Sequence, residues 1–154
     1  MRLPVFCSRR GVVTVRAIAF LFFAAASCPD APPEALALRV THHNGNVLAC
    51  GEGEPGKATR VRTSTTILAV EEHAFVLDAC PANADCHAPM RTRVELSGGS
   101  VGDLRRFLAP GPATFELDVQ PGSPCRWSLA VLDAAGTLLR IEDGKLVLAR
   151  QGPG

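Results

Sequence analysis

The sequence has little net charge, few aromatic residues and no long apolar run, and each shortage excludes a class of protein. Its 154 residues carry a formal net charge of +1, whereas a nucleic-acid-binding domain has a strong basic excess. Aromatic residues make up only 5% of the chain and tyrosine is missing, so few rings remain to stack against sugars. No apolar run reaches the roughly 18 residues that a transmembrane helix needs. Since the apolar content of 47% is too high for a disordered chain, we expect one folded domain that binds no nucleic acid.

Common catalytic and cofactor-binding patterns are missing as well. The chain contains no H-E-x-x-H motif, no phosphate-binding loop and no dinucleotide-binding fingerprint. Gly98-Gly99-Ser100-Val101-Gly102 matches the G-x-S-x-G pattern of a nucleophile elbow, but the fold that uses this elbow places its histidine after the serine. All four histidines of this chain precede Ser100. We interpret the segment as a glycine-rich loop between strands, and we predict no catalytic residue, no bound metal and no cofactor.

The first 27 residues contain no acidic side chain and have the composition of a secretory signal. Four arginines precede an unbroken apolar run from Ala17 to Ala26, which ends at Ser27. The arginines are Arg2, Arg9, Arg10 and Arg16. A positive segment, a short apolar core and small residues at its end are the three parts of a signal peptide. Ten residues of helix span only about 15 Å, half the hydrocarbon core of a bilayer, so we expect residues 1–27 to be cleaved rather than retained as an anchor.

The end of this leader resembles the bacterial lipobox. In Ala25-Ala26-Ser27-Cys28, small residues precede a cysteine, although the usual pattern has leucine where Ala25 stands. The resemblance covers the leader alone, and it implies that Cys28 is lipidated, becomes the mature N-terminus and anchors the protein to a membrane of the cell envelope. An ordinary cleaved signal with an unmodified Cys28 is the alternative.

The segment after Cys28 has the composition of a tether. Residues 28–35 include Pro29-Asp30-Ala31-Pro32-Pro33-Glu34, and proline-rich segments act as semi-rigid spacers. Ser8 to Val13 also resembles a twin-arginine export motif, but Thr14 interrupts its tail, so the export route stays open. The leader holds four of the sixteen basic residues and none of the fifteen acidic ones, so the net charge after cleavage is −3.

From residue 36 to residue 150, apolar side chains tend to recur at every second position, which is the period of a β-strand. The alternation is clearest over 92–96, 115–119 and 125–131. Short one-sided strands with a turn every 8–12 residues are typical of antiparallel sandwiches. The sequence therefore predicts an all-β domain over 36–150, an antiparallel β-sandwich of eight or nine short strands.

Turn signals divide this region. Asn44-Gly45 and Asp143-Gly144 are strong indicators of tight hairpins. The stretch from Ser100 to Leu108 is ambiguous, because Ser100 with Asp103 resembles a helix cap while the residues around Pro110 read as a strand that turns into the next one. We favour a strand there, and we expect residues 151–154 to form a disordered tail.

Four of the six cysteines remain for the domain. Cys7 leaves with the leader and Cys28 is assigned to the lipid. Cys50, Cys80, Cys86 and Cys125 allow three disulfide connectivities, and the sequence alone does not choose among them. We favour a local Cys80–Cys86 bridge with a long-range Cys50–Cys125 bridge, because export leads to an oxidising compartment. A long-range bridge stabilises a domain by about 4 kcal/mol.

Metal binding is the alternative for the region around Cys80. Cys80, Cys86 and the neighbouring histidines are zinc-type ligands, but their spacing differs from that of zinc knuckles. Asp78 to Asp85 resembles a fragment of thrombospondin-type calcium repeats, yet it offers only three side-chain ligands, and calcium requires six to eight oxygens. A disulfide-closed turn explains the segment better.

Together these features indicate an envelope lipoprotein whose disulfide-stabilised β-sandwich acts as a non-catalytic binding or structural accessory. Its expected partners are the membrane, through the lipid, and an envelope protein or surface ligand, contacted by loops at one end of the domain. Two alternatives are a small secreted enzyme or inhibitor that acts through the Cys80–Cys86 loop, and a calcium-dependent adhesion module.

Overall fold

The computed structural model describes residues 35–51, 56–80, 85–86, 90–99 and 101–151. The expected signal peptide, Cys28 and nearly all of the tether lie outside these residues, as do 152–154 of the expected tail. The strands are β1 (Ala37–Thr41), β2 (Val47–Cys50), β3 (Thr59–Val70), β4 (Ala74–Asp78), β5 (Arg91–Ser97), β6 (Gly111–Gln120), β7 (Arg126–Asp133), β8 (Gly136–Glu142) and β9 (Lys145–Ala149). No helix within the described part is long and apolar enough to cross a membrane.

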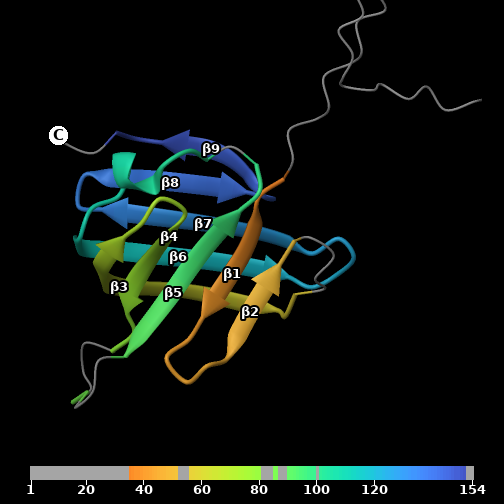
Figure 1. The fold of residues 1–154 in the computed structure, drawn as a ribbon, viewed down its shortest axis with the longest axis horizontal. Helices are drawn as coiled ribbons and strands as arrows, with labels where there is room; N and C mark the ends of the chain where they lie inside the picture. The colour runs from red at the N-terminus through yellow and green to blue at the C-terminus, as the bar shows by residue number, and fades with distance from the viewer. Residues whose placement is uncertain (1–34, 52–55, 81–84, 87–89, 100, 152–154) are drawn as a thin grey trace, which may run out of the picture. The chain divides into compact units, whose positions relative to one another are not determined.

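All nine strands belong to one antiparallel sheet, in the order β2-β1-β5-β4-β3-β6-β7-β8-β9. The prediction of an all-β antiparallel domain with eight or nine strands is therefore confirmed. The expected division into two separate sheets is not found in the described part of the chain, because the hydrogen-bonded ladder runs from β2 to β9 without a break. Instead, β1 and β5 cross in front of β6 and β7, so that one half of the sheet covers the other (Figure 1).

Strand β3 joins the two halves because it changes partner along its twelve residues. Its first part, Thr59–Ile67, pairs with β6, and its last part, from Ile67 to Val70, pairs with β4. A register shift between Ile67 and Ala69 marks the point of change, and such bulges bend a strand and increase its twist. This bend explains how one sheet produces two layers without a second set of edges.

The core lies between these layers and follows the alternation of the sequence. Val94 and Leu96 of β5 are buried together with Leu117 of β6 and Val131 of β7. Phe75 of β4 meets Phe115 of β6 edge to face, with the ring centroids 6.3 Å apart, which is a favourable aromatic geometry. The period-two prediction for β5 and β6 is correct, since their intervening side chains are exposed or half-buried. In β7 the alternation is broken at Ala130, which is also buried.

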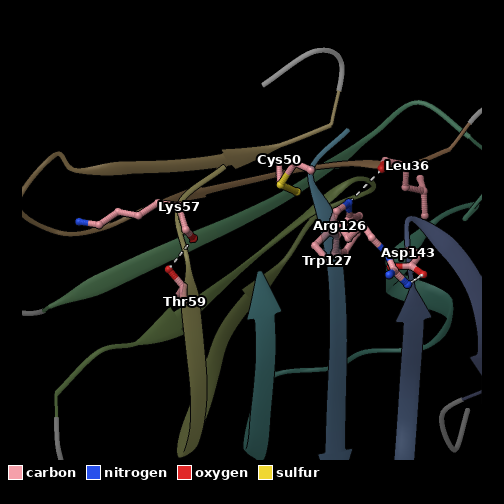
Figure 2. The surroundings of a disulfide bond; sticks show 8 residues. Leu36, Cys50, Lys57, Thr59, Arg126, Trp127 and Asp143 are labelled. Carbon is pink, nitrogen blue, oxygen red and sulfur yellow. Dashed lines mark hydrogen bonds and ion pairs between the residues drawn. A yellow bond between two sulfur atoms is a disulfide. The ribbon is translucent and has the colours of Figure 1, made fainter. Parts of the chain in front are cut away.

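Two hydrogen bonds of Leu36 and one disulfide close one end of the folded sheet, which we call the closed end. Figure 2 shows the bond between Trp127 and Leu36, with Cys50 of the disulfide nearby. The Trp127 indole N–H donates to the Leu36 carbonyl at 3.2 Å, and the Leu36 N–H donates to the Gly144 carbonyl at 2.8 Å. A disulfide joins Cys50, the last residue of β2, to Cys125, directly before β7. These contacts link β1 and β2 to the β7–β9 part of the sheet, although no ladder connects them.

The two hairpin predictions agree with the turns observed. Asp143 and Gly144 both have positive φ, at 49° and 72°, as a type I′ turn requires, and Glu142 pairs with Lys145 across them. Asn44 and Gly45 lie in the β1–β2 turn, where the Asn44 side chain accepts from the Asn46 N–H at 3.0 Å.

The prediction of a strand before β6 is wrong. Leu104–Arg106 form a short 3₁₀ turn, η1, capped by the Asp103 carboxylate, which accepts from the Arg105 N–H. Leu104 and Leu108, four positions apart, are both buried. In a strand Arg106 would share the face of these two leucines, but Arg106 is exposed, so the burial follows a helical period.

Candidate functional site

The structure contains both disulfides that the sequence analysis favoured. The Cα atoms of Cys50 and Cys125 are 5.5 Å apart, and those of Cys80 and Cys86 are 6.0 Å apart. Both distances are ordinary for disulfides. Because Cys80 and Cys86 are bonded to each other, neither supplies the thiolate that a zinc site needs.

The calcium interpretation finds no site among the described residues. The Asp78 carboxylate accepts from the Cys80 N–H at 3.0 Å, within its own turn, and Asp85 is exposed. In the described ranges no three acidic, histidine or cysteine side chains come together as metal ligands. Asn83 and His87, together with Ser100 of the glycine-rich loop, lie outside the described residues.

An open cleft of about 250 Å³ lies between β1 and β2 on one side and the first part of β3 on the other. Its apolar walls come from Val40, Leu48, Leu77, Phe115 and Leu117. Hydroxyl groups surround these walls, and they belong to Thr59, Thr63, Ser64, Thr65 and Thr92. A mainly apolar hollow with a few hydroxyls is a common form of binding site, since each hydroxyl can donate or accept a hydrogen bond.

The cleft exists because the inner face of β3 is not covered. Val61 is paired with Leu117, and Thr63 with Phe115, so each pair shares one face of the sheet. Leu117 and Phe115 are only 4% and 5% exposed, whereas Val61 is 38% exposed. Along the first part of β3 the core therefore ends at β6, and the side chains of Val61 and Thr63 line the cleft instead of packing into the core.

Among the described residues, the edge of β3 beside the cleft also has no strand partner. Strand β4 ends at Asp78, and its pairing with β3 begins only at Ile67. The Thr65 hydroxyl donates to the Asp78 carbonyl at 2.7 Å, which fixes the point where the two strands separate. From Thr59 to Thr66, β3 has β6 as its sole strand partner within the described part of the chain.

Two arginines occupy the outer face of this part of β3. Arg60 lies 2.7 Å from the Asp118 carboxylate, and Arg62 lies 3.1 Å from Glu116. Both carboxylates are on β6, so they contact the arginines from one side. The arginine side chains are 82% and 77% exposed, which leaves their guanidinium donors accessible from the open edge.

The charged groups with shifted pKa values lie elsewhere, in exposed ion pairs. A hydrogen bond from Arg93 lowers the pKa of Glu71, with Arg93 and Glu71 2.6 Å apart. A hydrogen bond from Arg105 likewise lowers the pKa of Asp103. Both carboxylates are on the surface, and such shifts are typical of structural ion pairs as well as of reactive groups.

The chain matches no known protein-family profile. No curated protein shows significant similarity to it, and no solved structure matches its fold significantly. Function must therefore be inferred from the chain's own residues and their arrangement.

Sequence reasoning missed the cleft and the open edge. The signal that points to them is the composition of β3, Arg-Val-Arg-Thr-Ser-Thr-Thr over residues 60–66. A strand that covers a core has apolar residues on its inner face, but here Thr63 and Thr65 take two of those positions. Hydroxyl side chains on the inner face of a strand indicate a face that stays in contact with water.

Proposed function

We propose that this protein is a membrane-tethered, non-catalytic binding module of the cell envelope, and that the cleft beside β3 is its ligand site. The leader, the Ala25-Ala26-Ser27-Cys28 pattern and the acidic proline-rich segment of the sequence support the tether. The uncovered inner face of β3 supports the binding role, and it is the observation that carries the proposal. An apolar face left open within an otherwise packed domain is stabilised when a ligand covers it.

Anchoring is tested by labelling cells with an alkyne analogue of palmitate and recovering the exported protein. We expect the label on the wild-type chain and on Cys7→Ala, because Cys7 leaves with the leader. We expect no label on Cys28→Ala. An unlabelled wild-type protein, or a Cys28→Ala variant labelled like the wild type, refutes the lipid anchor.

Binding at the cleft is tested by NMR titration of the exported protein in detergent with isobutanol, a small molecule with a branched apolar end and one hydroxyl. We expect saturable shifts of amides in β3 and of neighbours of Leu48. Thr63→Phe fills the cleft and is expected to weaken binding by about tenfold or more, a loss of roughly 1.4 kcal/mol. Thr66→Phe, on the exposed outer face of the same strand, is the matched control. Equal binding by both variants refutes the cleft as the site.

A further inference from the structure

The free edge of β3 has the features of a surface that accepts another strand. Arg60 to Ser64 are five consecutive exposed residues, and β6 occupies only one side of them. In an antiparallel ladder, alternate residues direct their N–H and C=O groups to opposite sides. Part of the backbone of this segment therefore faces away from β6, where an extended chain can reach it.

The cleft below this edge has a size that suits side chains better than a free ligand. Its volume of about 250 Å³ is below the roughly 300–1,000 Å³ of sites for drug-sized molecules. A strand added beside β3 directs every second side chain to the inner face of the sheet. Such a strand places small apolar side chains between Leu48 and Val61, where they cover the exposed face.

The outer face adds a requirement for charge. Side chains of the added strand that point outward come next to Arg60 and Arg62, whose acidic partners among the described residues, Asp118 and Glu116, lie on β6. Opposite charges on paired strands are favourable and like charges are unfavourable. Acidic residues therefore suit the outward positions, because they contact the arginines from the side that β6 leaves open.

A second copy of the chain fits this edge poorly. Antiparallel pairing of two copies centred on Val61 places Arg60 opposite Arg62, and pairing centred on Arg62 places that arginine opposite itself. Pairing centred on Thr63 avoids these contacts, but it extends past Thr65, whose hydroxyl is bonded to the Asp78 carbonyl where β4 approaches. Strands β2 and β9 are the terminal edges of the described sheet, and both carry exposed apolar side chains. Strand β2 is only four residues long, and the ladder of β9 with β8 shifts register between Arg140 and Ile141. Such irregularities at an edge oppose strand addition.

We propose that the free edge of β3 binds an extended segment of a partner protein by strand addition, with small apolar residues alternating with acidic ones. The apolar side chains enter the cleft, and the acidic side chains pair with Arg60 and Arg62. Backbone hydrogen bonds supply affinity in this mode of recognition, and the alternate side chains supply specificity. This inference rests on the proposed binding role of the cleft and names its ligand.

The test uses fluorescence anisotropy of the exported protein in detergent with three labelled nine-residue peptides. The first peptide alternates valine with glutamate, and the second alternates valine with lysine. The third has the same residues as the first, but all its valines are in one block and all its glutamates in another. We expect saturable binding of the Val-Glu peptide, at least tenfold stronger than binding of either other peptide. Because the contact is between charges at an exposed edge, binding should weaken as salt is raised.

Charge reversal separates a direct contact from a structural effect. Arg62→Glu should weaken binding of the Val-Glu peptide on the order of fivefold and strengthen binding of the Val-Lys peptide by a similar factor. Arg140→Glu, an exchange of an exposed arginine on β8, is the matched control and should change neither. If Arg62→Glu loses binding of both peptides and Arg140→Glu loses it equally, the assignment of Arg62 as a direct peptide contact is overturned.

Hydrogen exchange identifies strand addition itself. The Val-Glu peptide should slow the exchange of amides between Thr59 and Ser64, whereas isobutanol in the cleft should not. If isobutanol binds and no peptide does, strand addition is wrong while the binding cleft remains. If neither binds, both proposals fall. A dimer that forms without peptide and protects the same amides shows that a second copy is the occupant and overturns the proposal.

Discussion

Removal of the Cys50–Cys125 disulfide should destabilise the domain about twice as much as removal of the Cys80–Cys86 disulfide. The bridges close segments with sequence separations of 75 and 6 residues. In the chain-entropy treatment, loops of these lengths reduce the entropy of the unfolded chain by amounts worth roughly 4.5 and 2.2 kcal/mol at 25 °C. Typical domains have a total stability of about 5–15 kcal/mol, so the first loss takes a large share of it.

The assay is urea unfolding of the exported protein in detergent at 25 °C, followed by Trp127 fluorescence. The two double variants, Cys50→Ala with Cys125→Ala and Cys80→Ala with Cys86→Ala, are compared with the wild type. Cys50 and Cys125 are buried, so their replacement also removes packing and adds to the difference. Equal losses, or a larger loss from the Cys80–Cys86 pair, refute the argument that the long loop and the closed end dominate.

Three further predictions concern the closed end and its surroundings. All are measured as urea midpoints by circular dichroism, because Trp127→Phe removes the only tryptophan of the chain. Trp127→Phe leaves the Leu36 carbonyl without its indole donor and should cost about 1–3 kcal/mol; an unchanged midpoint would show that the hydrogen bond is dispensable. Gly144→Ala should be more destabilising than Gly136→Ala, since both have positive φ but only at Gly144 would the new Cβ lie 2.7 Å from the Leu36 carbonyl oxygen; the reverse order would contradict the turn geometry. A hydrogen bond from Arg126 lowers the folded-state pKa of Asp143. The ion pair therefore stabilises the fold above the ordinary carboxylate pKa, and this stabilisation is lost as the pH falls through the lower folded-state pKa. Asp143→Asn should therefore unfold with a weaker pH dependence between pH 6 and pH 3, and an unaltered dependence would exclude this ion pair as a contributor.

Local features of the fold were predictable because short-range chemistry determines them. The alternation over 115–119 locates β6 and its buried face, since each side chain on a strand takes the opposite side from its neighbour. Asp143-Gly144 specifies a two-residue hairpin because both positions need positive φ. The even number of cysteines in the domain and the expected export of the protein predicted two disulfides. The choice of connectivity, which the structure matches, was a preference rather than a deduction.

Long-range features were not predictable in the same way. Nothing in the local pattern of β3 shows that it changes partner at Ile67, because strand order depends on contacts between distant segments. Local signals around Leu104 conflict. Leu104 and Leu108 fit a helical face, but the nearby prolines resemble those of a strand end, and the prediction of a strand followed the prolines. The cleft also arises from strand order. It forms because β4 ends at Asp78 and leaves the first part of β3 without a strand partner on that side within the described chain.

The position of Leu36 determines how the domain responds to tension. In an anchored chain, any pull between the membrane and a bound partner enters the domain at the start of β1, where Trp127 and Gly144 hold Leu36. From there the force passes through β1 to β2 and into the covalent link between Cys50 and Cys125. His42, at the other end of β1, lines the cleft roughly 20 Å away. In the proposed tethered arrangement, tension therefore reaches the cross-linked end first, and the Cys50–Cys125 disulfide holds the end of β2 to the start of β7 there.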